Sequence, residues 1–266
     1  TCGLVEQMAS DEIMLCMTGD PMWAEHCEEV AFNSYPAAVM PDFKALRYIT
    51  CPNHAISDSK NHHPGIDNRG PFLSMNPFSS RCCQHNHAQG WPYFTEHLVL
   101  ATPDNGVATA IYAACKATVK VGDGKEITLH EETNYPFEEG IAFTVSTGEK
   151  VAFPFYLRIP SWTQKAEVRV NGKKVSAAPV AGKYLCINRE WANGDRVELT
   201  LPMSLSMRTW QVNKNSVSVD YGPLTLSLKI AEKYVEKDSR ETATGDSKWQ
   251  KGADSKKWPT TEIYPD

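Results

Sequence analysis

The chain has 266 residues, of which 41% are hydrophobic and 22% charged, values typical of a globular protein with a sizeable core. Its formal net charge is −5, and Lys and Arg nowhere form a run. Phosphate binding depends on clustered basic residues, so we expect no nucleic-acid partner. We also expect no membrane partner, because no stretch approaches the roughly 18 apolar residues that span a bilayer.

Two helices are predicted at the start of the chain. The first covers residues 4–17 and carries an apolar line, with the acidic residues off that line. The apolar line consists of Val5, Ala9, Ile13 and Cys16. Gly19 suits the left-handed position after a helix, Asp20 suits an N-cap, and Pro21 suits a first helical position. The sequence therefore predicts a helix end and a helix start within four residues.

The second helix is predicted to run to about Ser34 and to expose Glu25, Glu28 and Glu29. Residues 43–50 are predicted to be extended, and residues 53–80 to form a long loop, which is usually functional or disordered. A further helix is predicted over 84–100, with Pro92 in its first part. Two helices cannot close a helical bundle alone, so we expect the chain to be a piece of a longer protein.

Beyond residue 105 the sequence predicts a β-sandwich, because short runs rich in Val, Ile, Thr and aromatic residues recur between turn signals. The predicted strands are 107–113, 117–121, 127–130, 141–146, 151–159, 166–170, 183–188, 197–201 and 217–229. Gly122-Asp123-Gly124 and Asn171-Gly172 have the composition of hairpin turns.

Eight cysteines, at 2, 16, 27, 51, 82, 83, 115 and 186, are too scattered for a disulfide scaffold. Cys16, Cys27, Cys115 and Cys186 lie in apolar or strand patterns and are predicted to be small buried residues. Cys82-Cys83 is followed closely by His85 and His87, a concentration of potential metal ligands. From spacing alone, metal binding, a disulfide and structural thiols remain open for Cys2, Cys82 and Cys83.

An ordered set of motifs resembles glycoside hydrolase family 127. The motifs are Thr1-Cys2, Thr18-Gly19-Asp20, Arg81-Cys82-Cys83, Tyr135-Pro136, Leu157-Arg158-Ile159-Pro160-Ser161-Trp162, Val170-Asn171-Gly172-Lys173, Trp191-Ala192-Asn193-Gly194-Asp195 and Gly222-Pro223-Leu224. The resemblance implies an (α/α)6 barrel followed by an antiparallel β-sandwich. It divides the chain into barrel helices and active-site loops at 1–105, a sandwich at 106–230 and a further segment at 231–266.

The resemblance also implies a bacterial, exported, retaining β-L-arabinofuranosidase that acts on an arabinose-containing oligosaccharide or glycan. Carried over to this sequence, Cys2 and Cys83 are zinc ligands, Cys82 is both ligand and nucleophile, and Tyr48 lines the sugar pocket. The glutamate ligand and the acid/base glutamate would precede Thr1. We therefore expect the 266-residue chain alone to be inactive.

Departures from the family pattern leave two alternatives open. Family members often have prolines after the cysteine pair, whereas this chain has Gln84-His85-Asn86-His87, so His85 or His87 could replace the missing ligand. The same departure allows a non-catalytic carbohydrate-binding or scaffold protein with a structural zinc. A thiol-based redox protein is disfavoured, because the chain has no Cys-x-x-Cys motif.

Overall fold

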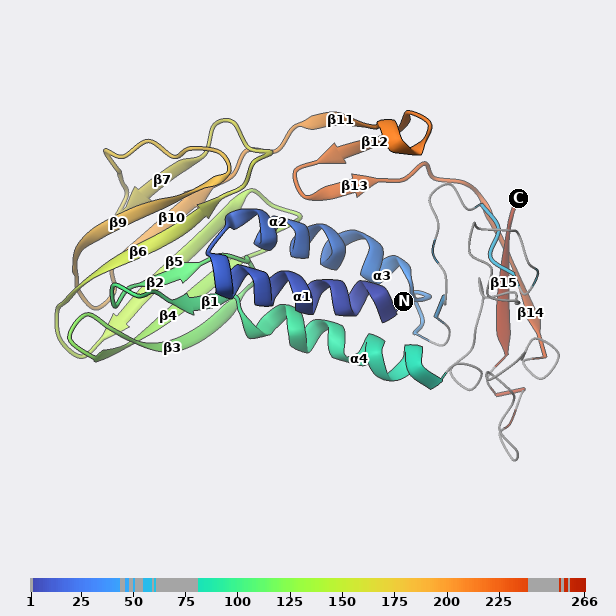
Figure 1. Ribbon diagram of the computed structural model, residues 1–266, viewed down its shortest axis with the longest axis horizontal. Coiled ribbons are helices and arrows are strands. Elements are labelled where there is room, and N and C mark those ends of the chain that lie inside the picture. Colours follow the sequence, from blue (N-terminus) through green and yellow to red (C-terminus); the bar gives the residue numbers. More distant parts are fainter. Residues whose placement is uncertain are drawn as a thin grey trace. The chain divides into compact units, whose positions relative to one another are not determined.

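The computed structural model describes residues 2–43, 46–47, 50, 55–58, 60, 81–238, 254, 256–257 and 259–266 (Figure 1). Most of the loop predicted over 53–80 and about half of the extended segment predicted over 43–50 lie outside these residues. The chain divides into two compact units. Unit 1 contains Thr1–Ala9, Asn33–Pro92 and Ser227–Asp266, and unit 2 contains Ser10–Phe32 and Tyr93–Leu226.

The helical elements are α1 (Cys2–Thr18), α2 (Pro21–Glu29), a π-helical turn η1 (Val30–Ser34), α3 (Tyr35–Ala37) and α4 (Arg81–Glu96). The predicted boundary between the first two helices is confirmed. Gly19 has a φ of +67°, and its N–H bonds to the carbonyl of Leu15 at 2.8 Å. Oδ1 of Asp20 accepts a hydrogen bond from the N–H of Met22 at 3.0 Å, and Pro21 occupies the first turn of α2.

Helix α4 begins three residues earlier than predicted, so the cysteine pair lies in its first turn and not in the preceding loop. It ends at Glu96, and the predicted continuation to Leu100 is wrong, because Val99–Ala101 forms strand β1. The β-branched Val99 pairs with Thr109 across an antiparallel ladder, which satisfies its backbone outside the helix.

Unit 2 contains two sheets. The first has the order β1-β2-β6-β9, with β2 (Val107–Thr109), β6 (Val151–Ile159) and β9 (Lys183–Trp191). The second has the order β3-β4-β5-β10-β7-β8, with β3 (Cys115–Val121), β4 (Lys125–Thr133), β5 (Gly140–Thr147), β10 (Arg196–Thr200), β7 (Glu167–Val170) and β8 (Lys173–Lys174). β2 and β6 are parallel, and the other pairs are antiparallel.

Apolar side chains of both sheets form one shared core, which confirms the predicted sandwich. Along β5, for example, Ile141, Phe143 and Val145 point inward, whereas the residues between them are less buried. Both predicted hairpins are present. Gly122 and Gly124 have positive φ at the β3–β4 turn, as do Asn171 and Gly172 at the β7–β8 turn.

Two smaller sheets complete the described residues. In unit 2, β11 (Leu205–Trp210), β12 (Ser216–Tyr221) and β13 (Leu224–Leu226) form an antiparallel sheet. The single strand predicted over 217–229 is wrong, because a turn at Gly222, with φ +57°, divides it. In unit 1, β14 (Glu232–Lys237) pairs with β15 (Thr260–Pro265).

The buried face of α1 differs from the prediction. Val5, Met8 and Leu15 are buried together with Glu12, whereas Ile13 is 56% exposed and Cys16 is also exposed. The hydrophobic pattern failed here because acidic side chains occupy part of the buried face and are accommodated by polar partners. Oε2 of Glu12 lies 2.6 Å from Nδ1 of His97.

The acidic residues of α2 were predicted to be solvated, and this is wrong for Glu28, which is fully buried. Its Oε1 lies 2.5 Å from Nη2 of Arg158 on β6 and accepts a hydrogen bond from the N–H of Tyr112 at 3.0 Å. Its Oε2 accepts a hydrogen bond from the hydroxyl of Tyr135 at 2.8 Å. The buried carboxylate thus joins α2 to the sandwich through partners that a helical pattern cannot reveal.

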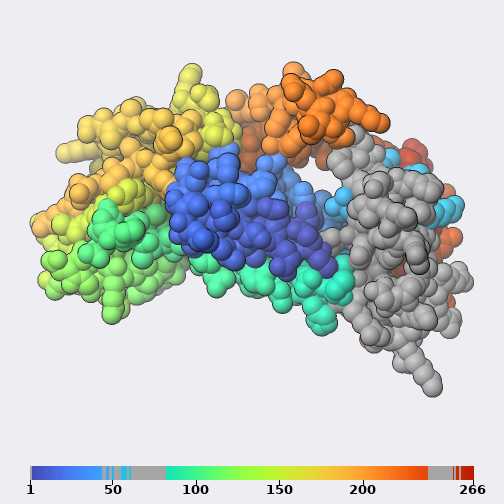
Figure 2. All heavy atoms as spheres, viewed as in Figure 1, coloured from blue at the N-terminus to red at the C-terminus, as the bar shows by residue number. Residues whose placement is uncertain are grey.

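The neighbouring glutamates strengthen this attachment. Glu25 accepts a hydrogen bond from the N–H of Ser161 at 2.8 Å, and Glu29 pairs with Arg208 at 2.6 Å. Figure 2 shows residues 21–32 of unit 2, as blue spheres, against the green and yellow spheres of the sandwich.

Among the described residues, no helix is long and apolar enough to span a membrane.

Candidate functional site

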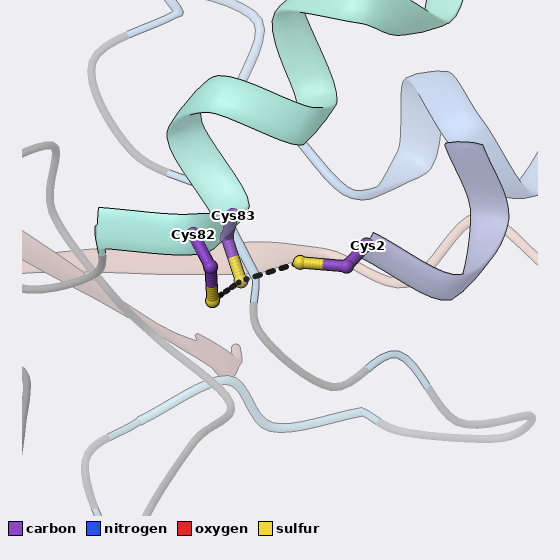
Figure 3. Close-up of side chains that lie close together, drawn as sticks. All are labelled: Cys2, Cys82 and Cys83. Atoms are coloured by element: carbon purple, nitrogen blue, oxygen red, sulfur yellow. Dashed lines mark hydrogen bonds between the residues drawn. The ribbon is translucent and has the colours of Figure 1, made fainter. Parts of the chain in front are cut away.

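Three cysteine side chains from two helices meet in unit 1. Sγ of Cys2 lies 3.6 Å from Sγ of Cys83, which lies 3.9 Å from Sγ of Cys82. Cys2 is at the first position of α1, and the pair is in the first turn of α4 (Figure 3). The sulfur atoms all lie within 4.8 Å of one another, and no disulfide joins them. Residues 80 positions apart in the sequence are therefore brought together as free thiols.

The three thiols differ in accessibility. Cys83 is buried, Cys2 is partly buried and Cys82 is exposed. Adjacent helical residues point about 100° apart, so one cysteine of the pair can pack inward while the other faces solvent. Cys83 and Cys2 are thus shielded from solvent, fully and partly, whereas a ligand from solution can reach the thiol of Cys82.

The environment of Cys2 favours its thiolate. Burial acts to raise the pKa of Cys2, but hydrogen bonds with Asn86, Cys83 and Cys82, together with the positive charge of the chain's first amino group, outweigh it, so the pKa is lowered overall. Asn86 was not predicted as a site residue. The signal that could have found it is its spacing, because residues three and four positions after the cysteine pair share its side of the helix.

The donor set and its spacing fit a zinc ion. A tetrahedral zinc bound to thiolates at about 2.3 Å would hold the sulfur atoms about 3.8 Å apart. The separations of Cys2 from Cys83 and of Cys83 from Cys82, 3.6 Å and 3.9 Å, lie on either side of that value. Thiolate sulfur is a preferred zinc donor, and three cysteines leave one tetrahedral position for a further ligand. These residues could therefore hold a metal ion.

The other predicted site residues do not join this group in the described part of the chain. His85 is exposed, and His87 stacks on Tyr35 with ring centroids 4.3 Å apart. The metal-binding group identified there contains the three cysteines without either histidine. Tyr48, predicted to line the sugar pocket, lies outside the described residues.

A second group of potential ligands lies in unit 2 and consists of Glu12, Glu96 and His97. Its geometry differs from that of the cysteines, because Oε2 of Glu12 and Nδ1 of His97 already form a hydrogen bond of 2.6 Å with one another. Sγ of Cys27 also donates to Oε1 of Glu12 at 3.7 Å. Burial raises the pKa of Glu12 to about 7, although His97 partly offsets this effect.

Two family models match the chain. One is described as "Beta-L-arabinofuranosidase, GH127 catalytic domain" and matches residues 1–96; the other is "Beta-L-arabinofuranosidase, GH127 middle domain" and matches residues 106–203. The chain belongs to glycoside hydrolase family 127. The three cysteines lie within the part matched by the catalytic-domain model.

Solved structures resemble this family 127 chain over most of its length. A structure described as "Glycoside hydrolase" is 27% identical, with a TM-score of 0.70, over 88% of this chain and 37% of the other. A GH127 β-L-arabinofuranosidase from Geobacillus stearothermophilus T6 (19% identical) and another GH127 β-arabinofuranosidase (21% identical) share the fold. Each has a TM-score of 0.68 over 98% of this chain and 46% of the other.

The family 127 chain thus spans 37–46% of the length of these structures. A comparison with curated protein sequences found no match.

Proposed function

We propose that this chain carries the cysteine part of the active site of a zinc-dependent, retaining β-L-arabinofuranosidase. One observation carries the proposal, namely three free thiols at the spacing of a tetrahedral thiolate site in a member of family 127. Two solved proteins with the same fold, a GH127 β-L-arabinofuranosidase and a GH127 β-arabinofuranosidase, support the choice of sugar. The substrate would be an arabinose-containing oligosaccharide or glycan.

We assign Cys82 as the nucleophile and Cys2 and Cys83 as ligands, with Cys82 also binding the metal. The accessibility of the three thiols supports this assignment, because the attacking sulfur must reach a substrate and Cys82 is the exposed one. When bound, zinc would keep Cys82 as the thiolate at neutral pH, where a free thiol with a pKa of about 8.5 is mostly protonated.

The proposed reaction has two displacements at the anomeric carbon. The sulfur of Cys82 bonds to that carbon while the bond to the leaving oxygen breaks, and a carboxylic acid of the enzyme protonates that oxygen. Water then attacks the same carbon, gives a proton to the resulting carboxylate and displaces the sulfur. Each displacement inverts the carbon, so the product retains its original configuration. The resemblance assigns the carboxylic acid to a glutamate outside these 266 residues.

The proposal includes the domain arrangement that the resemblance implies. Residues 1–105 would supply helices and active-site loops to an (α/α)6 barrel, 106–230 a sandwich, and 231–266 a further segment. Tyr48 remains a proposed substrate-binding residue on the same basis.

Hydrolysis of an aryl β-L-arabinofuranoside by the full-length protein tests the proposal. A Cys82→Ala variant should lose at least about a thousandfold in kcat, as expected when a nucleophile is removed. Cys186→Ala is the matched control, because Cys186 is another exposed free cysteine, and it should keep full activity.

Mass spectrometry of the quenched wild-type reaction should show one pentosyl group on the peptide that contains Cys82. If Cys82→Ala hydrolysed the substrate at the wild-type rate, Cys82 could not be the nucleophile. Binding of the oligosaccharide without turnover by the intact wild-type protein would instead favour the non-catalytic, zinc-braced alternative.

A further inference from the structure

The hydroxyl of Tyr35 is inserted into the backbone hydrogen bonds of α4. It donates to the carbonyl of His87 at 2.6 Å, and the backbone N–H of Trp91 hydrogen-bonds to the same hydroxyl. In an uninterrupted α-helix, this N–H and this carbonyl would bond directly to one another, because they are four residues apart. A side chain inserted at such a step is a recognised cause of local opening in a helix.

Tyr35 and His87 also hold one another through their rings. Their ring centroids are 4.3 Å apart with an interplanar angle of 19°, and Tyr35 is almost fully buried. Burial lowers the pKa of His87, and a hydrogen bond to the backbone of Tyr35 offsets only part of that effect. His87 is therefore fixed at its backbone carbonyl, its ring face and one of its two ring nitrogens by one tyrosine.

The space for this insertion depends on Gly90. A Cβ atom added at Gly90 would lie 2.6 Å from the hydroxyl oxygen of Tyr35 and closer still to two of its ring carbons. Pro92 follows two residues later and has no N–H to continue the helical ladder. Glycine is unfavourable inside a helix, so its presence at position 90 is explained by the tyrosine ring for which it leaves room.

The chain before Tyr35 also departs from regular helix. The π-helical turn Val30–Ser34 ends immediately before Tyr35. A π turn contains one residue more than an α turn, so it changes the direction in which the following side chains point. Such turns occur frequently at functional sites.

The step held by Tyr35 begins at His87, about one helical turn after the cysteine pair. Within α4 the N–H of His87 is positioned to bond to the carbonyl of Cys83, four residues earlier. The carbonyl of His87 is held by Tyr35 in the next turn. We infer that Tyr35 is a positioning residue that holds the first turn of α4, so that Cys82 and Cys83 face Cys2 at metal-binding distance. The inference rests on the proposed role of these cysteines.

Tyr35→Phe tests the inference, since it keeps the ring and removes only the inserted hydroxyl. Gly90→Ala tests it independently, because its methyl group displaces the ring. In the zinc-free 266-residue chain, dibromobimane joins thiols that lie a few ångströms apart, and peptide mapping identifies the Cys2–Cys83 product. Both variants should give this product severalfold more slowly than the wild type. Tyr156→Phe and Gly148→Ala are the matched controls, since Tyr156 lies in unit 2 and Gly148 has open space around its Cβ position.

Zinc affinity gives the second readout. Competition with a chromophoric chelator should show Kd raised about tenfold in both variants, the lower end of the usual effect of supporting residues around a metal site. The Co²⁺-loaded variants should also show weaker sulfur-to-cobalt charge-transfer bands. If Tyr35→Phe had the same crosslinking rate, zinc Kd and cobalt spectrum as the wild type, the positioning role would be overturned. A wild-type chain that crosslinks but binds no zinc would overturn the zinc part of the proposed function while leaving the positioning role supported by the crosslinking rates.

Discussion

Two clusters of ionisable side chains differ in how their polar atoms are satisfied. Around Glu28 in unit 2, a cation, a backbone N–H and a hydroxyl surround one buried carboxylate. Around Cys83 in unit 1, three thiols lie next to one another, and the cluster is partly open to solvent. Both oxygen atoms of the Glu28 carboxylate have protein partners, whereas the three cysteine sulfur atoms lie together at a spacing that suits a metal ion.

The difference separates a structural cluster from a candidate functional one. Burying a charge is costly unless it is paired and hydrogen-bonded, and Glu28 meets both conditions. Thiols form weak hydrogen bonds, so the gathering of three sulfur atoms within 4.8 Å of one another gains little stability by itself. Burial alone would have drawn attention to Glu28 and Arg158. The cysteines, whose sulfur atoms all lie within 4.8 Å of one another, are the better candidate for function.

Removing the cation from the complete cluster should have the largest effect on stability. Arg158→Met leaves Glu28 buried without its partner, at an expected cost of about 3–5 kcal/mol. Thermal unfolding combined with peptide-resolved hydrogen exchange would locate the loss in α2 and β6. Arg196→Met, which breaks exposed ion pairs of the same sandwich, should cost less than about 1 kcal/mol. Equal effects of the two variants would contradict the structural role of the Glu28 cluster.

Glu12 is an intermediate case, because it is buried but has no permanently charged partner among the contacts described above. Its pKa rises from an ordinary value of 4.5 to about 7, so the folded chain binds this proton more tightly than the unfolded chain does. The stabilisation is present below pH 4.5 and is lost as the pH rises through about 7. The loss should reach at most about 3 kcal/mol.

Other carboxylates titrate in the same range, so the test compares urea unfolding of the wild type with that of Glu12→Gln across this pH range. The difference between their free energies of unfolding should change with pH in the stated direction. Glu126→Gln, at an exposed site, should follow the wild type. A pH-independent difference between wild type and Glu12→Gln would contradict the raised pKa.

The stability contributed by the cysteine cluster should depend on bound metal, whereas that of the Glu28 cluster depends on a partner within the protein. Zinc at 100 times its Kd would stabilise the folded chain by about 2.7 kcal/mol if the unfolded chain does not bind it. The rise in Tm should disappear with EDTA and in Cys83→Ala, and persist in Cys16→Ala, whose thiol is outside the cluster. An undiminished rise in Cys83→Ala would place the metal elsewhere.

Local features were predictable from the sequence to the extent that they depend on neighbouring residues. The turn at Gly19-Asp20-Pro21 and the Asn171-Gly172 hairpin were predicted correctly, because φ > 0 and N-capping select particular residue types. Features that depend on distant partners were not predicted. The burial of Glu28 requires Arg158, and the buried face of α1 requires His97 beside Glu12.

The candidate site shows the same division. Cys2, Cys82 and Cys83 were grouped through ordered family motifs, and the structure places their sulfur atoms together. Tyr35 and Asn86 were not predicted, since neither has a motif and both act through three-dimensional contacts. A glycine and a proline within one predicted helix were the only sign in the sequence of an unusual contact on α4.

The close contact between Gly90 and Tyr35 has an evolutionary consequence. Any side chain at position 90 would overlap the tyrosine ring, so position 90 can change only when position 35 carries a smaller residue. The two positions should therefore vary together among related sequences, glycine occurring with tyrosine and larger residues with a shortened side chain at 35. Members that lack this pair would need a different way to hold the turn after the two cysteines.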